Sequence, residues 1–142
     1  MRLLQTLLLA VLCMLAIAAR AGEPNEMFMI RSTDKSFGQV TDAAKAYVKK
    51  QGWVYVNDAE LKGVVMIKFC VPEMAKDIFA AGDFVTAMLP CGQIGLYKKD
   101  GRTQIAMLHP GYMERIYPDP NIRRAAEKGL PLFQAMLEDI AK

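Results

Sequence analysis

Cys70 and Cys91 are the residues of this chain with the greatest chemical potential. They frame the segment FCVPEMAKDIFAAGDFVTAMLPC, in which twenty residues separate them and the central part has helical spacing. Cys70 stands just before the expected N-terminus of that helix, where the helix dipole and free amides favour a thiolate. Lys68 lies two residues earlier, on the same face of the preceding strand, and adds positive charge.

Several kinds of chemistry fit these residues, and the sequence leaves them open. A disulfide between Cys70 and Cys91 would close a loop that stabilises the fold by roughly 3 kcal/mol. A free Cys70 could act as a nucleophile or carry sulfur. Together with His109, the only histidine of the chain, the two thiols could hold a soft metal ion or haem. Alternatively, both cysteines are reduced, partly buried small residues.

The N-terminal sequence indicates the compartment of the protein, and the compartment determines whether its cysteines can form a lasting disulfide. Arg2 is followed by an almost wholly apolar run, and the small-x-small sequence ending at Ala21 predicts cleavage before Gly22. Residues 1–21 are therefore predicted to be a signal peptide, which also carries away the third cysteine, Cys13. We expect a periplasmic or secreted protein that is free of the membrane, in a compartment where disulfides persist.

The expected mature chain, residues 22–142, has the length of one domain. Cleavage removes two arginines and no acid, so 18 Lys and Arg become 16 against 15 Asp and Glu. The mature charge is then close to neutral, and no basic patch with interleaved aromatic residues is present. Nucleic acid is therefore not an expected partner.

Strands and helices are expected in the order β-α-β-β-α-β-β-α. Strands are expected at 27–32, 53–58, 64–71, 91–98 and 102–110, with turns at 60–63 and 98–101. Helices are expected at 37–51 after the N-cap Ser36, at 72–82, and from 120 onward, the last one bent or broken at Gly129 and Pro131. Neighbouring pairs of strands separated by helices predict an α+β fold. It would be a two-layer sandwich with a largely antiparallel sheet and its helices on one face.

Alternation along the strands assigns the two cysteines to a face. In the strand at 64–71, the positions that alternate with Lys68 are all apolar and are expected to face the helices. These core positions are Val65, Ile67, Phe69 and Val71. In the strand at 91–98, Ile94 and Leu96 have the same role. Cys70 and Cys91 then share the less apolar face, whereas the parity of His109 places it on the other.

The pieces FCVP (69–72), LPC (89–91), IGLYKKDG (94–101) and HP (109–110) resemble a bacterial family known as domain of unknown function number 302. The resemblance runs from about Met27 to the last helix. It implies a small two-layer α/β domain with a tendency to pair, so a homodimer is expected. Val71 stands where members often have asparagine. The family has no assigned activity, so the resemblance implies none for this chain.

No catalytic motif such as G-x-S-x-G, H-E-x-x-H or C-x-x-C is present, which favours a non-enzymatic protein. The favoured hypothesis is an exported small binding or carrier module with a site at Cys70, Cys91 and Lys68 for a thiol, sulfur species, small ligand or soft metal. One alternative is a thiol-redox enzyme with Cys70 as nucleophile and Cys91 as resolving cysteine. Another is a structural or interaction domain with no site.

Overall fold

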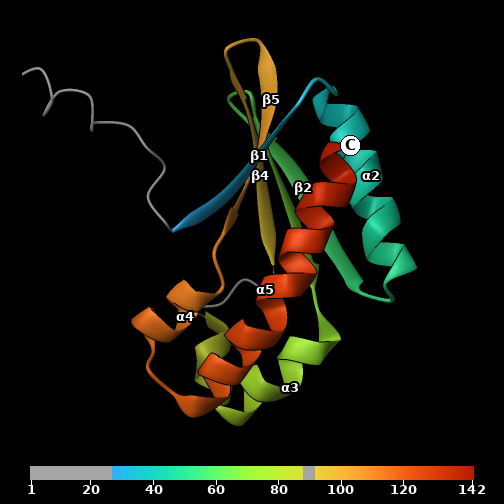
Figure 1. The fold of residues 1–142 in the computed structure, drawn as a ribbon. Coiled ribbons are helices and arrows are strands. Elements are labelled where there is room, and N and C mark those ends of the chain that lie inside the picture. The colour runs from blue at the N-terminus through green and yellow to red at the C-terminus, as the bar shows by residue number, and fades with distance from the viewer. Residues whose placement is uncertain (1–26, 88–91) are drawn as a thin grey trace, which may run out of the picture.

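The structure is a computed structural model that describes residues 27–87 and 92–142. Five strands form one sheet in the order β1-β5-β4-β3-β2, and all neighbouring strands are antiparallel. Helices α2 and α5 lie side by side on one face of this sheet, and α3 and α4 lie beyond one end of the strands (Figure 1). The expected α+β, two-layer architecture is confirmed. The bounds of the strands are β1 Phe28–Thr33, β2 Val54–Leu61, β3 Val64–Cys70, β4 Gln93–Lys99 and β5 Arg102–Leu108.

Two hairpins supply most of the sheet. β4 and β5 are joined by the expected turn, in which Asp100 and Gly101 both have positive φ. β2 and β3 are joined by Lys62 and Gly63, again both with positive φ. This second turn is shorter than the predicted 60–63, because β2 continues to Leu61. A two-residue turn with positive φ matches the twist of the paired strands and lets them pair up to the turn.

Helix α2 (Phe37–Lys50) begins as predicted. The hydroxyl oxygen of Ser36 accepts from the Gln39 N–H at 3.3 Å, and the Gln39 side chain accepts from the Ser36 N–H at 2.8 Å. This reciprocal pair satisfies two backbone donors at the helix start. The chain leaves the helix at Gly52, which has φ of +70°.

The second helical segment follows β3. Helix α3 (Pro72–Ala80) has its proline in the first turn, as expected, and is followed by the short 3-10 helix η1 (Asp83–Ala87). Helix α4 (Gly111–Ile116) was not predicted. Its six residues are too few to give a recognisable apolar period, so the sequence contains no clear signal for it.

Helix α5 (Pro120–Ala141) is continuous. Of the bend or break expected at Gly129 and Pro131, the break is therefore wrong. Gly129 serves a different purpose, because a Cβ there would lie 2.6 Å from the terminal methyl of Met74 on α3. The glycine thus permits the close contact of α3 with α5. Burial of the residues that follow the proline, among them Phe133 and Leu137, offsets the hydrogen bond that Pro131 cannot donate.

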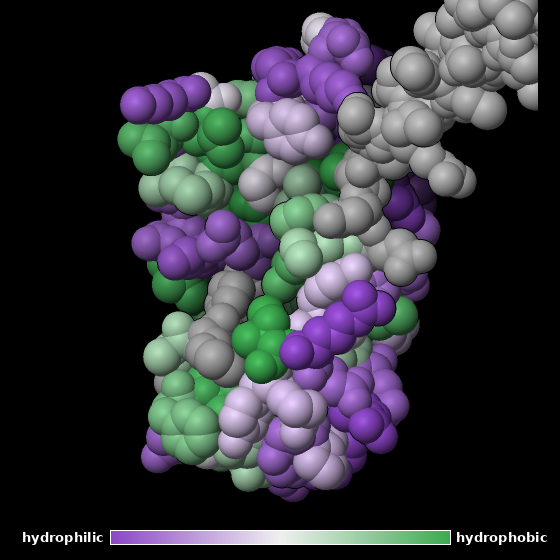
Figure 2. Space-filling view, turned by 90° about the vertical axis from the view of Figure 1, so that its left-hand side faces the viewer, coloured by the Kyte–Doolittle hydropathy of each residue, from purple (hydrophilic) through white to green (hydrophobic). Residues whose placement is uncertain are grey.

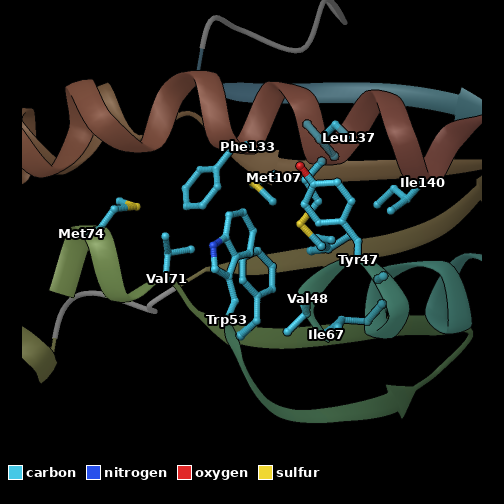
Figure 3. Close-up of a cluster of buried hydrophobic side chains, with 14 of the residues drawn as sticks. Tyr47, Val48, Trp53, Ile67, Val71, Met74, Met107, Phe133, Leu137 and Ile140 are labelled. Carbon is cyan, nitrogen blue, oxygen red and sulfur yellow. The ribbon is translucent and has the colours of Figure 1, made fainter. Parts of the chain in front are cut away.

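The core lies between the sheet and α5, with α2 and α3 closing its sides. Trp53 stacks on Phe69 at 5.6 Å between ring centroids, and Phe133 meets Phe69 edge-on at 6.1 Å. Figure 3 shows side chains of α2, α3, α5 and the strands pointing toward one another in this space. The predicted core positions on β3 and β4 are all confirmed as buried: Val65, Ile67, Phe69, Val71, Ile94 and Leu96.

Two sets of polar contacts fix α5 against the rest of the fold. At its C-terminal end, the Thr33 hydroxyl donates to the Ala141 carbonyl oxygen at 2.8 Å. In its first half, Lys128 Nζ lies 2.5 Å from an oxygen of the buried Asp77 on α3, and Arg124 Nε lies 3.5 Å from the other. The hydrogen bond from Lys128 outweighs desolvation and holds the pKa of Asp77 below its usual value.

The sheet face away from α2 and α5, which we call the open face, is nearly uncharged at its centre. The register aligns one uncharged residue from each strand across it: Ile30, Ala106, Gly95, Met66 and Ala59. Figure 2 views the molecule from the side opposite these helices and shows hydrophobic surface between hydrophilic side chains in its upper part. Phe28 and Val64 on this face remain 46% and 38% exposed.

Candidate functional site

The candidate site lies at the end of the sheet where β3 finishes and β4 begins. Lys68 is the register partner of Gln93, and the Phe69 N–H donates to the Gly92 carbonyl oxygen at 3.0 Å. β5 ends at Leu108 beside this point, and His109 follows it directly. The segments FCVP and HP, far apart in sequence, therefore converge at the same end of the sheet.

Cys70 is the last residue of β3 and is half-buried. It is disulfide-bonded. The other two cysteines of the chain, Cys13 and Cys91, lie outside the described residues. A disulfide sulfur has no thiolate to offer a metal or an electrophile, so any thiol chemistry at Cys70 requires prior reduction.

Helix α3 begins two residues after Cys70. Its N-cap is Val71, which has no oxygen with which to accept from the first backbone amides, and the proline at the first turn supplies no donor. The Met74 and Ala75 N–H groups donate to the Val71 carbonyl oxygen at 3.1 and 3.2 Å. The Glu73 N–H and the helix dipole therefore face the end of β3 without a side-chain acceptor from the N-cap. This is the surrounding that stabilises a thiolate once the disulfide is reduced.

Gly92 fixes the path of the chain beside Cys70, and sequence reasoning missed it. A Cβ at this position would lie 2.5 Å from a carbon of the Phe69 ring, so no other residue fits without displacing that ring. Only glycine lets the backbone before β4 lie against the aromatic core. The glycine after LPC was the available signal, although nothing local in the sequence shows that its neighbour is Phe69.

Lys68 is exposed, and its alternation with the buried Ile67 and Phe69 places it on the open face with Cys70, as predicted. In the register, it lies between Gln93 on β4 and Asn57 on β2. Neither neighbour is acidic, and none of the ion pairs among the described residues includes Lys68, so its ammonium group adds positive charge to this end of the open face.

His109 lies just past the end of β5 and is half-buried. Its backbone N–H donates to the Met27 carbonyl oxygen at 2.8 Å, and its Nδ1 accepts from the Gly111 N–H at 3.1 Å. The second contact leaves the imidazole proton on Nε2 in the neutral ring.

The predicted metal set of Cys70, Cys91 and His109 stays a prediction. Within residues 27–87 and 92–142, no three His, Cys, Asp or Glu residues are grouped so that they could hold a metal ion. Cys91 is outside that range, so the set as predicted is not tested. A soft metal would also need the thiolates that the disulfide of Cys70 consumes.

A cavity of about 40 Å³ lies beside the site. Its walls are Gly92, Gln93, Met107, Leu108, Pro110, Met113 and Phe133. This volume suits about one water molecule and is far below what haem requires.

The chain is a small α+β domain with a five-stranded antiparallel sheet, and the comparisons with known proteins agree with this fold. The family model "Domain of unknown function DUF302" matches residues 28–140, so the chain belongs to this family. A crystal structure of an uncharacterized conserved DUF302 protein from Bacillus stearothermophilus is similar, with a TM-score of 0.70 at 16% identity. The match covers 82% of this chain and 99% of that one. No curated protein matches this chain. In the part of the chain that the structure describes, no helix is both long and apolar enough to cross a membrane.

Proposed function

We propose that this protein is an exported small binding or carrier module whose site lies at the Cys70 end of the sheet, where Cys70 and Cys91 form one redox-sensitive pair. The observation that carries the proposal is the disulfide-bonded state of Cys70 at the end of β3. The predicted signal peptide adds support, because disulfides persist outside the cytosol.

The register of β3 and β4 favours Cys91 as the partner. Each step forward along β3 corresponds to one step back along β4, from Val65 opposite Leu96 to Lys68 opposite Gln93. The hydrogen bond from Phe69 to Gly92 continues this pattern by one step. One further step would set Cys91 opposite Cys70. Residues opposite each other on antiparallel strands have Cα atoms about 4.5–5.5 Å apart, within the range for a disulfide.

In this proposal, the disulfide form cannot bind the ligand, and reduction makes the two thiols available for it. Reduction would give two neighbouring thiols, with the charge of Lys68 on the same face. One thiolate of such a pair can take the outer sulfur of a persulfide donor, which then leaves as a thiolate. Alternatively, the two thiolates can hold a soft metal ion with His109 as a further ligand. The ligand in this hypothesis is small, and no catalysis is required of the protein.

A thiol-redox enzyme is the second candidate, and the start of α3 favours it, because no N-cap side chain accepts from the amides that follow Cys70. The Cys70 thiolate would attack a substrate disulfide, form a mixed disulfide and release one substrate thiolate. Cys91 would then attack the mixed disulfide, release the second thiolate and leave the Cys70–Cys91 disulfide. Two electrons would pass from the protein dithiol to the substrate.

The experiment starts from protein exported with its own N-terminus and purified without reductant. We expect an N-terminus at Gly22 and, before reduction, an intact mass two hydrogens lighter than after reduction. A carrier would also show a reducible adduct on a fraction of the molecules, whereas a redox enzyme would not. A retained Met1 in the membrane fraction would overturn the compartment, and with it most of the argument for the pair.

Single cysteine variants separate the two candidates further. The reduced Cys91→Ser variant leaves Cys70 alone, and the Cys70→Ser variant leaves Cys91 alone. A redox enzyme requires the first variant to react with a small disulfide, such as oxidised glutathione, clearly faster than the second. Equal, slow rates would exclude the enzyme. Equal rates and no adduct would leave a structural disulfide in a domain with no site.

A further inference from the structure

A second concavity lies beyond the end of β5 and makes no use of the cysteines. It has a volume of about 340 Å³ and is lined by His109, Gly111, Tyr112 and Arg115. This volume falls within the range of small-molecule sites, which begin at about 300 Å³. Unlike a typical apolar site, its lining carries an imidazole, a phenol and a guanidinium group. All three groups can donate hydrogen bonds.

Two of these groups are held in place by contacts within the pocket. The guanidinium carbon of Arg115 lies 4.3 Å from the centre of the Tyr112 ring, a cation–π distance that restricts a long side chain. The His109 ring meets the Tyr112 ring edge-on at 6.4 Å. Because Nδ1 of His109 accepts from the Gly111 N–H, Nε2 is the nitrogen that donates in the neutral ring.

The local charge is positive. Glu114, the acid next to Arg115 in sequence, forms its ion pair with Arg123 instead, at 2.6 Å. That hydrogen bond raises the pKa of Arg123 above its usual value, as expected of a firmly paired guanidinium. Among the ion pairs of the described residues, none includes Arg115. Its guanidinium donors are therefore not taken up by a carboxylate of the described chain.

We propose that the pocket of His109, Tyr112 and Arg115 binds a small oxyanion, either an inorganic anion of the sulfate type or the carboxylate of an organic acid. Hydrogen bonds to charged acceptors are the strongest that such donors form, and a planar guanidinium suits two oxygens at once. The inference goes beyond the proposed function, since it stands whatever the state of Cys70.

The test uses the full exported protein and the single histidine as reporter. Because His109 is the only histidine, its imidazole C–H signals in an NMR spectrum report on this pocket without assignment. Sodium sulfate and sodium acetate are titrated separately at fixed pH, with sodium chloride keeping the ionic strength constant. We expect a saturable shift with at least one of the two anions. The anion with the lower dissociation constant identifies the source of the oxyanion.

Variants of the pocket decide whether the binding is specific. Arg115→Gln should weaken binding about tenfold or more, because a charge-assisted hydrogen bond is lost. Arg115→Lys keeps the charge without the fork and should restore part of the affinity. Lys50→Gln removes one positive charge from the end of α2, well away from α4, and should leave binding unchanged (Figure 1). The indole signal of Trp53, the only tryptophan, verifies the fold of each variant.

The proposal is overturned if neither anion gives a saturable shift, or if Arg115→Gln binds as tightly as the unchanged protein. Should Arg115→Gln fail to fold, Tyr112→Phe takes its place. That change keeps the ring under Arg115 and removes only the hydroxyl, so a loss of a few-fold supports the pocket. An affinity equal to that of the unchanged protein contradicts it.

Discussion

Lys68 and Phe69 are neighbours on β3 with opposite surroundings, since Phe69 is fully buried and Lys68 is exposed. Changing Phe69 to Asp buries an unpaired charge, which costs several kcal/mol against a typical total stability of about 5–15 kcal/mol. We expect this variant, and likewise Leu96→Asp, to yield no soluble folded protein. Soluble yield and circular dichroism check this.

The matched controls are Lys68→Ala and Gln93→Ala on the other face of the same strands. Because surface substitutions of this kind change stability by about 0.5 kcal/mol or less, both should fold normally. If the controls fail and the aspartate variants fold, the assignment of Cys70 to the open face is wrong.

Gly92 gives a second prediction at this scale. Gly92→Ala sets a Cβ 2.5 Å from the Phe69 ring, so we expect a loss of about 1–3 kcal/mol as the core moves to make room. Gly95→Ala, three residues further along in β4, is its control, because nothing lies within 4 Å of the added Cβ. Urea unfolding of both variants measures the difference. Equal stabilities would mean that Gly92 does not determine the approach to Cys70.

At the scale of elements, the contact of α3 with α5 depends on the buried Asp77. Its pKa is lowered by Lys128, so protons bind it more readily in the unfolded chain than in the folded one. The stabilisation is therefore complete above the unfolded pKa of about 3.9 and is lost as the pH falls through the lower folded value. Asp77→Asn should lower the melting temperature at neutral pH and flatten its decline in acid.

Thermal unfolding followed by circular dichroism between neutral and acidic pH checks this, with Asp34→Asn as control. Asp34 is an exposed acid paired with Arg102 and is expected to contribute little. An Asp77→Asn curve parallel to that of the unchanged protein would show that this carboxylate does not link the helices.

Elements with local signals could be predicted from the sequence, whereas their contacts could not. The capping serine of α2 and the alternation along β3 are encoded within a few residues, and both predictions are confirmed. The neighbour of Gly92 and the place of β1 beside β5 depend on residues far apart in the chain. A proline inside a helix usually bends or breaks it, so a bend or break was predicted at Pro131. Burial of the following turns against the sheet offsets the lost hydrogen bond, and the helix continues.

The same distinction applies to the candidate site. Cys70, Lys68 and His109 could be chosen by residue type, and the face of the first two could be predicted by parity. The pocket of His109, Tyr112 and Arg115 was missed, because it depends on the unpredicted helix α4. Nothing in the sequence alone indicates that a histidine at a strand end contacts the first turns of that helix.

For the whole molecule, we propose that the open face is the contact surface of the homodimer that the sequence predicts. Its central row is uncharged and flanked by exposed apolar side chains, so two copies could pack sheet against sheet. Ala106→Lys places a charge at the centre of this face without entering the core. We expect it to fold normally and to shift a dimer to monomer in sedimentation velocity.

The control is Lys50→Gln, a change of an exposed residue at the end of α2, away from the open face. It should leave the sedimentation of the dimer unchanged. If the unchanged protein sediments as a monomer at all concentrations, the open face is not a contact between copies.

The central claim is that Cys70 and Cys91 form one pair, and a map of disulfide-linked peptides tests it most directly. Protein exported with its own N-terminus is alkylated without reduction, digested and analysed by mass spectrometry. We expect a linked pair of peptides, one containing Cys70 and the other Cys91, that separates on reduction. Both cysteines recovered as alkylated single peptides, or either one linked to another partner, would contradict it.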